Sequence, residues 1–319
     1  MVDVAGAASG GAARFRSELV SYLGRRPNSA LRLLGVGRSL SAAWLLQREL
    51  IARWSARLAV NSVSFIGPGH KTVVLRNAWH FARTGDQPPV GMGGRRLRLE
   101  IRIVHSTCQR ADVIVTPTHD MADRVASLLP GIAARIKVRP HPLSFKPTLR
   151  RPEMAPQAPF VFVPILPAPH KDLGSFLRHL DGALSSLGRE ELIVTTADLH
   201  DLPQTLRTSK RVRAVGRQPL DQMPDWYAFC SLVFFPTTVE SFGYPLAEAR
   251  SVGRPVVGVN SAVNREVAGP ALFAYELDAP ETLCTALEAA LGCSSLQPDP
   301  SPFAPDEYFD WLIARSSGQ

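Results

Sequence analysis

Two glutamates that flank the expected start of a helix are the residues best placed to do chemistry. Glu240 and Glu248 lie in residues 236–249, which read PTTVESFGYPLAEA. A helix is expected to begin near Pro245, because proline is favoured in the first helical turn, and Gly243 lets the backbone approach a ligand closely. The unpaired amides of that turn favour a phosphate or a sugar oxygen, and carboxylates accept hydrogen bonds from sugar hydroxyls. The segment therefore predicts a site for a phosphorylated sugar. The alternative is a helix-capping Glu240 and a solvated Glu248.

The rest of the chain predicts two sheets that position this site. Strands are expected at Leu31–Leu34, Thr72–Leu75, Asp112–Val115, Ile136–Val138, Phe160–Val163, Glu191–Thr195, Val212–Val215, Leu232–Phe235 and Pro255–Val259. Helices are expected near Ala12–Leu23, Ala42–Leu58, Arg95–Cys108, Met121–Leu129, Asp172–Leu187, Met223–Cys230, Pro245–Val252, Pro280–Leu291 and Asp306–Ala314. This alternation predicts an α/β protein with two Rossmann-like, doubly wound parallel-sheet domains facing a cleft. Ligands of such sheets bind at the carboxyl ends of the strands.

Composition excludes several classes of protein. The chain has 319 residues, of which 45% are hydrophobic and 20% charged, a balance typical of globular proteins. It has no apolar run long enough for a membrane span. Its first residues do not resemble a signal peptide, so we expect the protein in the cytoplasm. Its four cysteines form no CxxC pair, which indicates reduced core residues rather than disulfides or a metal site. No Asp-x-Asp sequence occurs and the histidines are scattered, so metal catalysis lacks support.

Charge is distributed unevenly along the chain. Residues 1–150 hold 23 basic and 8 acidic residues, whereas residues 151–319 hold 13 and 20. The basic half would suit anionic lipid, anionic glycan or nucleic acid, although a general excess of arginine explains it equally well. Nucleic acid is not expected, because no aromatic stacking platform or known module is present. The stretch Arg95–Ile103 alternates basic and apolar residues, which predicts either peripheral contact with the inner face of an anionic membrane or a solvated helix face.

The segment around the two glutamates resembles a known family. Glu240 and Glu248 match the EX7E motif of GT4-type retaining glycosyltransferases, which have the GT-B fold. The resemblance continues through residues 224–228 (PDWYA), 253–257 (GRPVV) and 264–269 (NREVAG) and covers residues 160–292. It implies transfer of a sugar from a nucleotide diphosphate sugar to a glycan, lipid-linked or other acceptor, with retention of configuration, in glycan biosynthesis. No further cofactor is expected, since the nucleotide sugar is itself the donor substrate.

The resemblance also implies a role for each residue of the motif. Glu240 would contact the hydroxyls of the donor sugar as a catalytic residue. The backbone at Phe242, Gly243 and Tyr244, with Pro245 in the same turn, would hold the sugar and the diphosphate. Glu248 would accept hydrogen bonds from the ribose.

A lysine after the first strand of the second half is expected to stabilise the departing diphosphate. Lys171 stands in the sequence His170-Lys171-Asp172, at the expected start of a helix. The alternative is an ordinary solvated lysine, which the helix dipole disfavours at this end. The family often has an arginine shortly before this lysine, but residues 164–169 contain none. Arg217 is the candidate to replace it.

The first half matches the family less closely. Gly10 and Gly11 resemble its glycine loop near the donor phosphates, and they do not form the GxGxxG motif of a dinucleotide site. So few residues precede this loop that we expect either a late start or a sheet that lacks an edge. His80, after an expected strand, is assigned a catalytic or substrate-binding role, with a structural histidine as the alternative, and Arg76 would bind phosphate. Thr118 is expected to cap a helix, and His119 to face the cleft.

Proline-rich stretches set the expected domain boundaries. Residues 139–159 contain six prolines, a composition that forms neither helices nor central strands. We expect an acceptor-side domain over residues 1–145, a hinge over 146–159 and a nucleotide-sugar-binding domain over 160–296. Residues 297–319 would form a linker and a closing helix that, as in the family, packs back on the N-terminal domain.

Three other functions remain open at this stage. The same fold serves nucleotide-sugar epimerases, which need no acceptor. The missing arginine leaves room for a non-catalytic sugar-nucleotide binder, and the basic first half for a protein that binds anionic glycans or lipids.

Overall fold

The computed structural model describes residues 1–7, 10–26, 31–52, 56–84, 86, 94–165, 172–293 and 296–316. Its strands are β1 (Val2–Asp3), β2 (Leu33–Leu34), β3 (Arg57–Ala59), β4 (Lys71–Val74), β5 (Val113–Thr116), β6 (Ile136–Val138), β7 (Phe160–Val163), β8 (Leu192–Thr195), β9 (Val212–Ala214), β10 (Leu232–Phe235), β11 (Val256–Val259) and β12 (Leu272–Tyr275). Its helices are α1 (Gly10–Gly24), α2 (Ala42–Ile51), α3 (Arg95–Cys108), α4 (His119–Leu128), α5 (Leu173–Ser186), α6 (Gln204–Arg207), α7 (Met223–Phe229), α8 (Tyr244–Ser251), α9 (Ala262–Ala268), α10 (Glu281–Gly292) and α11 (Pro305–Ser316). Short 3-10 helices include η1 (Ala78–Phe81).

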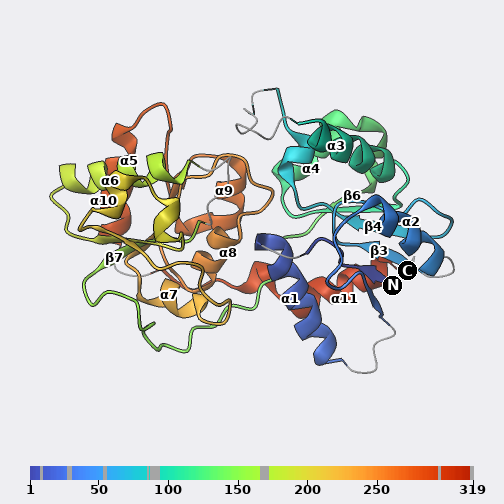
Figure 1. Ribbon diagram of the computed structural model, residues 1–319, viewed down its shortest axis with the longest axis horizontal. Coiled ribbons are helices and arrows are strands. Elements are labelled where there is room, and N and C mark those ends of the chain that lie inside the picture. Colours follow the sequence, from blue (N-terminus) through green and yellow to red (C-terminus); the bar gives the residue numbers. More distant parts are fainter. Residues whose placement is uncertain are drawn as a thin grey trace.

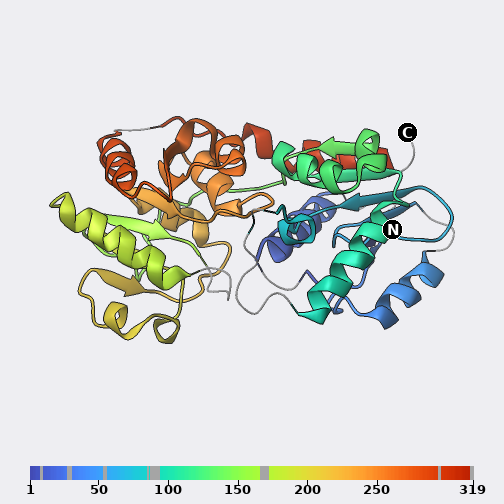
Figure 2. The same ribbon diagram turned by 90° about the horizontal axis from the view of Figure 1, so that it is seen from above.

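The described residues form two six-stranded sheets, each flanked by helices. The first sheet has the order β2-β1-β3-β4-β5-β6 and the second β12-β11-β10-β7-β8-β9. All strand pairs within them are parallel. The sheets belong to separate halves of the chain that lie side by side (Figures 1 and 2). The expected α/β architecture with two Rossmann-like domains is confirmed.

Two apolar layers cover the first sheet. On one face Val73 and Ile114 pack with Val104 of α3 and Met121 of α4, and Leu45 of α2 joins this layer. On the other face Val74 and Val115 pack with α1 and with Tyr308, Phe309 and Leu312 of α11. The last helix therefore packs against the N-terminal half of the chain (Figure 1).

Several expected elements have different bounds in the structure. The helix expected at Ala42–Leu58 ends at Ile51, and Arg57–Ala59 forms the interior strand β3 instead. Apolar periodicity alone could not separate the two, because Leu58 and Ala59 continue the helical pattern but are buried in the sheet. Strand β12 and helix α9 were not expected, whereas α3 has the expected bounds.

The first strand is short but does not lie at an edge. Val2 and Asp3 pair with β2 on one side and with β3 on the other. The expectation that the sheet lacks an edge at this place is therefore wrong. A strand of two residues suffices here because buried polar contacts hold it.

Asp3 is the centre of those contacts. It is fully buried and accepts hydrogen bonds from Trp44 Nε1 at 3.1 Å, Asn61 Nδ2 at 2.9 Å and Arg48 Nη1 at 2.5 Å. Arg48 is also buried, and its Nη2 donates to the carbonyls of Val63 and Ser64. The network ties β1, α2 and the segment after β3 together, and both charges in it are paired and hydrogen-bonded, as burial requires.

No helix of the described residues combines the length and the hydrophobicity that a membrane span requires.

Replacing the buried carboxylate should destabilise the N-terminal half strongly. Asp3→Ala leaves the Arg48 guanidinium buried without its counter-charge, and we expect a loss of about 3–5 kcal/mol in the free energy of unfolding. Asp306→Ala is the matched control, because its ion pair with Arg25 is about half exposed and its loss should cost less than about 1 kcal/mol. Urea unfolding followed by tryptophan fluorescence measures both. Equal midpoints for the two variants would contradict the assignment.

Candidate active site

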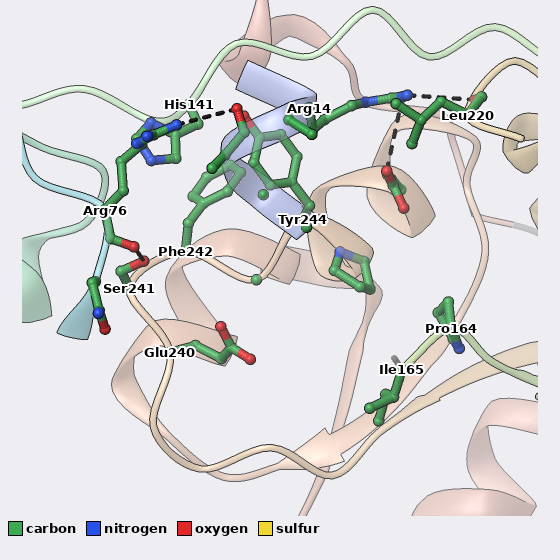
Figure 3. A pocket seen from close by; sticks show the side chains of 18 of the residues that line it. Arg14, Arg76, His141, Pro164, Ile165, Leu220, Glu240, Ser241, Phe242 and Tyr244 are labelled. Atoms are coloured by element: carbon green, nitrogen blue, oxygen red, sulfur yellow. Dashed lines mark hydrogen bonds and ion pairs between the residues drawn. The ribbon is translucent and has the colours of Figure 1, made fainter. Parts of the chain in front are cut away.

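A cavity of about 450 Å³ lies between the two halves of the chain. Figure 3 shows its wall, to which α1, the β4 end, the 139–159 segment and the β10–α8 loop all contribute. The sequence-predicted residues that line it are Gly10, Gly11, Arg76, His80, Arg217, Glu240, Phe242, Gly243, Tyr244, Pro245 and Glu248. Lys171 was also assigned to the site and lies outside the described residues. Among the described residues that were expected in the site or the cleft, His119 does not line the cavity.

The helix start predicted from Pro245 is at Tyr244, and it opens toward the cavity. Gly243 precedes it with a φ of 78°, and no side chain caps this terminus. A Cβ at Gly243 would lie 2.9 Å from Leu246 Cδ1, on the packed side of the turn. Glycine is therefore required by the left-handed backbone and by the packing. The uncapped amides can donate to an anion or to a sugar oxygen.

Glu248 is buried rather than solvated. The Tyr227 hydroxyl donates to its Oε2 at 2.7 Å, and Arg14 Nη2 lies 3.8 Å from its Oε1. Burial raises the pKa of Glu248, although Arg14 and the Tyr227 hydroxyl favour the ionised form. The solvated alternative is wrong, because the side chain points inward from α8 and lines the cavity.

Arg14 is a cavity residue that the sequence did not single out. It belongs to α1 of the N-terminal half, yet its Nη1 donates to the Leu220 carbonyl at 3.4 Å and its guanidinium approaches Glu248 (Figure 3). Its Nη2 also donates to the Ser144 carbonyl at 3.4 Å. One buried cation therefore connects α1, the linker and the C-terminal half. The only signal in the sequence was its position three residues after Gly11.

His80 lines the cavity as a neutral imidazole. Asn77 Oδ1 accepts from the Trp79 amide at 3.1 Å, so the Asn77 Nδ2 faces His80 Nε2 at 3.2 Å and donates to it. The ring proton is then on Nδ1, which has no partner among the described residues. Burial lowers the pKa of His80 to about 4. At neutral pH this histidine is a hydrogen-bond donor and not a cation.

His141 and Arg76 form an enclosed polar group at the back of the cavity. His141 is 2% exposed, and neither ring nitrogen has a partner among the described residues. Its ring stacks on Tyr244 with 5.9 Å between centroids and meets Phe242 edge-on at 5.1 Å. Arg76 donates to the Ala12 carbonyl at 3.3 Å, and burial lowers its pKa to about 10. Sequence reasoning missed His141, since it read residues 139–159 as a linker only.

Three further predicted residues, Arg217, Gly10 and Gly11, line the cavity. Arg217 is exposed, follows the end of β9 and lines the wall. Gly11 touches the C-terminal half, because a Cβ there would lie 3.1 Å from the Tyr244 ring. Gly10, which begins α1, has a φ of 55° and open space around it.

Thr118 and His119 connect the two halves outside the cavity. Thr118 caps α4 as predicted, accepting from the Met121 amide at 3.2 Å. His119 is not a lining residue of the cavity. It is largely exposed, and its Nδ1 lies 2.8 Å from Glu266 Oε1 of α9.

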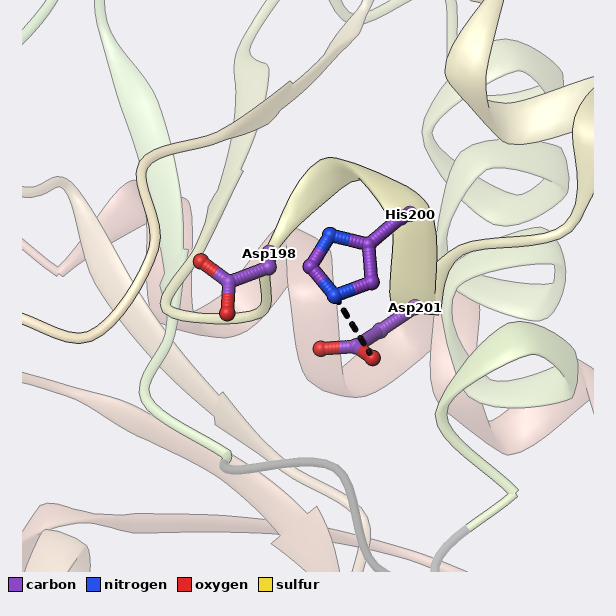
Figure 4. A group of neighbouring side chains, drawn as sticks. All are labelled: Asp198, His200 and Asp201. Carbon is purple, nitrogen blue, oxygen red and sulfur yellow. Dashed lines mark ion pairs between the residues drawn. The ribbon is translucent and has the colours of Figure 1, made fainter.

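A second group of chemically capable side chains lies after β8. Asp198, His200 and Asp201 each offer a ligand atom within 4.8 Å of the others (Figure 4). All three are exposed, and none lines the cavity. Exposed acidic groups often gather without a ligand, so this group is assigned no site.

The cavity combines two kinds of polar group. Helix amides, Arg217 and Arg14 supply positive charge and donors that suit a diphosphate. Glu240 and Glu248 supply acceptors that suit sugar and ribose hydroxyls. A ligand with linked phosphate and sugar groups would use both.

The C-terminal half of the chain matches a family of known proteins. Residues 160–292 match the family described as Glycosyl transferases group 1. Over 255 residues the chain is 27% identical to D-inositol 3-phosphate glycosyltransferase 1 of Catenulispora acidiphila. That alignment covers 71% of this chain and 57% of the relative, so the chain spans little more than half of the relative's length.

Solved structures share the architecture at low sequence identity. The glycosyltransferase AviGT4, involved in avilamycin A biosynthesis, aligns with a TM-score of 0.57 and 15% identity, over 97% of this chain and 89% of its own. The pneumococcal O-GlcNAc transferase GtfA, solved with UDP and GlcNAc, aligns with a TM-score of 0.55 and 13% identity, over 88% and 60%. The chain therefore has the GT-B fold, and its residues 160–292 match the family model of the group 1 glycosyltransferases.

Proposed function

We propose that this chain transfers a glycosyl unit from a nucleotide diphosphate sugar to an acceptor. The observation that carries the proposal is the uncapped start of α8, which opens into the cavity between Glu240 and Glu248. Amides that favour phosphate thus lie beside carboxylates that favour sugar hydroxyls. Both the family match and the relatives' names support a sugar-transfer reaction.

The donor would span the cavity from Glu248 to Glu240. Glu248 is proposed to accept from the ribose, since its Oε2 is held by Tyr227 and its Oε1 faces the cavity side near Arg14. The amides at Phe242, Gly243 and Tyr244 would hold the diphosphate, and Glu240 would orient the sugar. His80, which lines the cavity, would contact an oxygen of the donor or of the acceptor.

The negative charge of the leaving diphosphate would be stabilised by this chain's own cations. Arg217 and Arg14 line the cavity, and Lys171 is proposed to join them on sequence grounds. We further propose a metal-independent transfer that retains the anomeric configuration, as the resemblance implies. Turnover that persists in EDTA would support the first point, and NMR of the product anomer would test the second.

The acceptor is proposed to be a glycan or a lipid-linked or other polyol. The name of the Catenulispora relative adds D-inositol 3-phosphate as one compound to try. Basic residues concentrate in the N-terminal half, which would favour an anionic acceptor.

Nucleotide binding should single out one donor base and depend on Glu248. UDP, GDP and ADP are compared by thermal shift, and the best one is titrated calorimetrically. Glu248→Gln should weaken its affinity about 10- to 100-fold, because a hydrogen bond to a charged acceptor is lost. Tyr227→Phe is the control that removes only the protein-side partner of Glu248 and keeps the carboxylate in place. Equal affinity of Glu248→Gln and the wild type would remove Glu248 from the ribose site.

Loss of the Glu240 carboxylate should abolish turnover and leave the fold intact. For Glu240→Gln we expect at least a 100-fold lower rate of nucleoside diphosphate release from the nucleotide sugar, with an unchanged melting temperature. Glu281→Gln, an exposed glutamate in the first turn of α10, is the matched control. Full activity of the Glu240 variant would reject the assignment. Isomerised sugar without any transfer would indicate an epimerase.

We also propose peripheral association with an anionic membrane through α2 and α3. Leu46 and Leu50 of α2 are 68% and 76% exposed, and Arg95, Arg98 and Arg102 are exposed on α3. Both helices lie on the same side of the first sheet (Figure 2), so apolar and basic groups share one face.

Vesicle binding checks this surface. The double variant Leu46→Gln/Leu50→Gln should bind phosphatidylglycerol-containing vesicles at least tenfold more weakly than the wild type, since two exposed apolar side chains are lost. Leu199→Gln/Leu277→Gln removes leucines of the C-terminal half that are 55% and 52% exposed, and it should change nothing. Sedimentation with and without the anionic lipid measures both, and equal binding of the two variants would refute the surface.

A further inference from the structure

The segment that carries Glu240 is fastened to both halves of the chain. Residues 236–243 connect β10 with α8. On the C-terminal side, the buried Asn264 of α9 donates its Nδ2 to the Thr237 carbonyl at 3.4 Å and to the Val259 carbonyl at 2.8 Å. On the other side, Ser241, the residue next to Glu240, holds the segment against the N-terminal half.

Ser241 makes two hydrogen bonds to the N-terminal half. Its Oγ donates to the Arg76 carbonyl at 2.7 Å (Figure 3), and its own carbonyl accepts from Thr118 Oγ1 at 3.0 Å. These partners follow β4 and β5, which are neighbours in the first sheet. Ser241 therefore holds the loop through both its side chain and its backbone carbonyl.

Both partners of Ser241 are themselves fixed. Thr118 is fully buried, and the same hydroxyl that donates to Ser241 accepts from the Met121 amide as the cap of α4. The Arg76 amide donates to Ser62 Oγ at 3.1 Å. Contacts within the N-terminal half therefore hold both groups to which Ser241 bonds.

A third contact joins the same two halves next to Thr118. The Glu266 carboxylate of α9 accepts from the His119 amide at 2.9 Å and lies 2.8 Å from His119 Nδ1. Glu266 thus places negative charge at the first turn of α4, a favourable position at a helix N-terminus. Helix α9 holds the loop through Asn264 and the N-terminal half through Glu266.

We propose that Ser241, Thr118 and Glu266 are positioning residues that place the Glu240 carboxylate only when the two domains are closed. The inference rests on the proposed function. Separation of the domains breaks both bonds of Ser241 and leaves the Asn264 bond to Thr237 intact, so the Glu240 side of the loop is released. Closure around a bound donor restores it, which couples the reaction to exclusion of water.

A positioning role differs measurably from a structural one. Tyr227 holds Glu248, and Tyr244 begins α8, so both belong to the C-terminal half and lie outside the loop that Ser241 fastens. Nucleotide affinity should therefore survive loss of the Ser241 hydroxyl, while the rate of the chemical step falls. A simple packing defect would lower stability and affinity together.

The experiment measures kcat and nucleotide affinity separately in the full chain. The probe is the nucleotide sugar whose base is chosen by thermal shift, and nucleoside diphosphate release is followed. Ser241→Ala should lower kcat about tenfold, the value of one hydrogen bond, and change Kd for the nucleoside diphosphate less than twofold. Ser241→Thr, which keeps the hydroxyl, should restore most of the rate.

Two further comparisons complete the test. Ser251→Ala removes a serine of α8 whose Oγ donates within its own helix, and it should leave kcat unchanged. Thr118→Val should lower kcat as Ser241→Ala does, whereas Ser41→Ala, which removes the cap of α2, should not. Glu266→Ala should lower kcat by a smaller factor, about twofold to threefold, because its partner His119 is largely exposed.

Three results would overturn the proposal. An unchanged kcat in both Ser241→Ala and Thr118→Val is one. A parallel loss of kcat and nucleotide affinity is the second, and equal damage from Ser251→Ala is the third. Failure of the proposed function itself is distinguishable, because the wild type would then bind no nucleotide, or would bind it without transferring the sugar.

Discussion

The contact between the β10–α8 loop and the carboxyl edge of the first sheet is the constraint on which the site depends. Parallel strands place their carboxyl ends along one edge, so β4 and β5 present Arg76 and Thr118 at the same place. The second sheet presents the loop after β10 in the same way. Where the two edges meet, Ser241 bonds to both N-terminal partners and the cavity is closed on one side.

Two buried arginines of the cavity wall differ in how their charge is compensated. Arg14 has Glu248, Glu18 and two carbonyls around it, so its charge is compensated. Arg76 donates to one carbonyl and lies over the Phe15 ring, and no carboxylate of the described residues is within ion-pair distance. Burial lowers the pKa of His141, and the nearby Arg76 guanidinium lowers it further.

The cavity residues also connect to the stability of the N-terminal half. The Asp3 network fixes β1, and the turn that follows leads into the Gly10-Gly11 start of α1. Gly11 contacts Tyr244, and Arg14 one turn later reaches Glu248. Helix α1 thus enters the site from the same half of the chain that the Asp3 network stabilises.

The sequence by itself determined the local features of this protein. The spacing of Glu240, Gly243, Pro245 and Glu248 predicted the helix start, and strand–helix alternation predicted the two parallel sheets, because both depend on near neighbours in the chain. Helix α3 and the Thr118 cap follow from the same local rules. The end of α2 did not, since burial in the sheet decided between helix and strand at Arg57–Ala59.

Only the tertiary structure decided which polar groups meet. Arg14 and Glu248 are 234 positions apart along the sequence and still form an ion pair, and Ser241 meets Arg76 and Thr118 from the opposite domain. His141 lies in a proline-rich stretch whose composition describes a linker, yet it is buried among the rings of Phe15, Phe242 and Tyr244. Such contacts depend on how two domains pack, and packing sums many weak long-range interactions that no local pattern in the chain encodes.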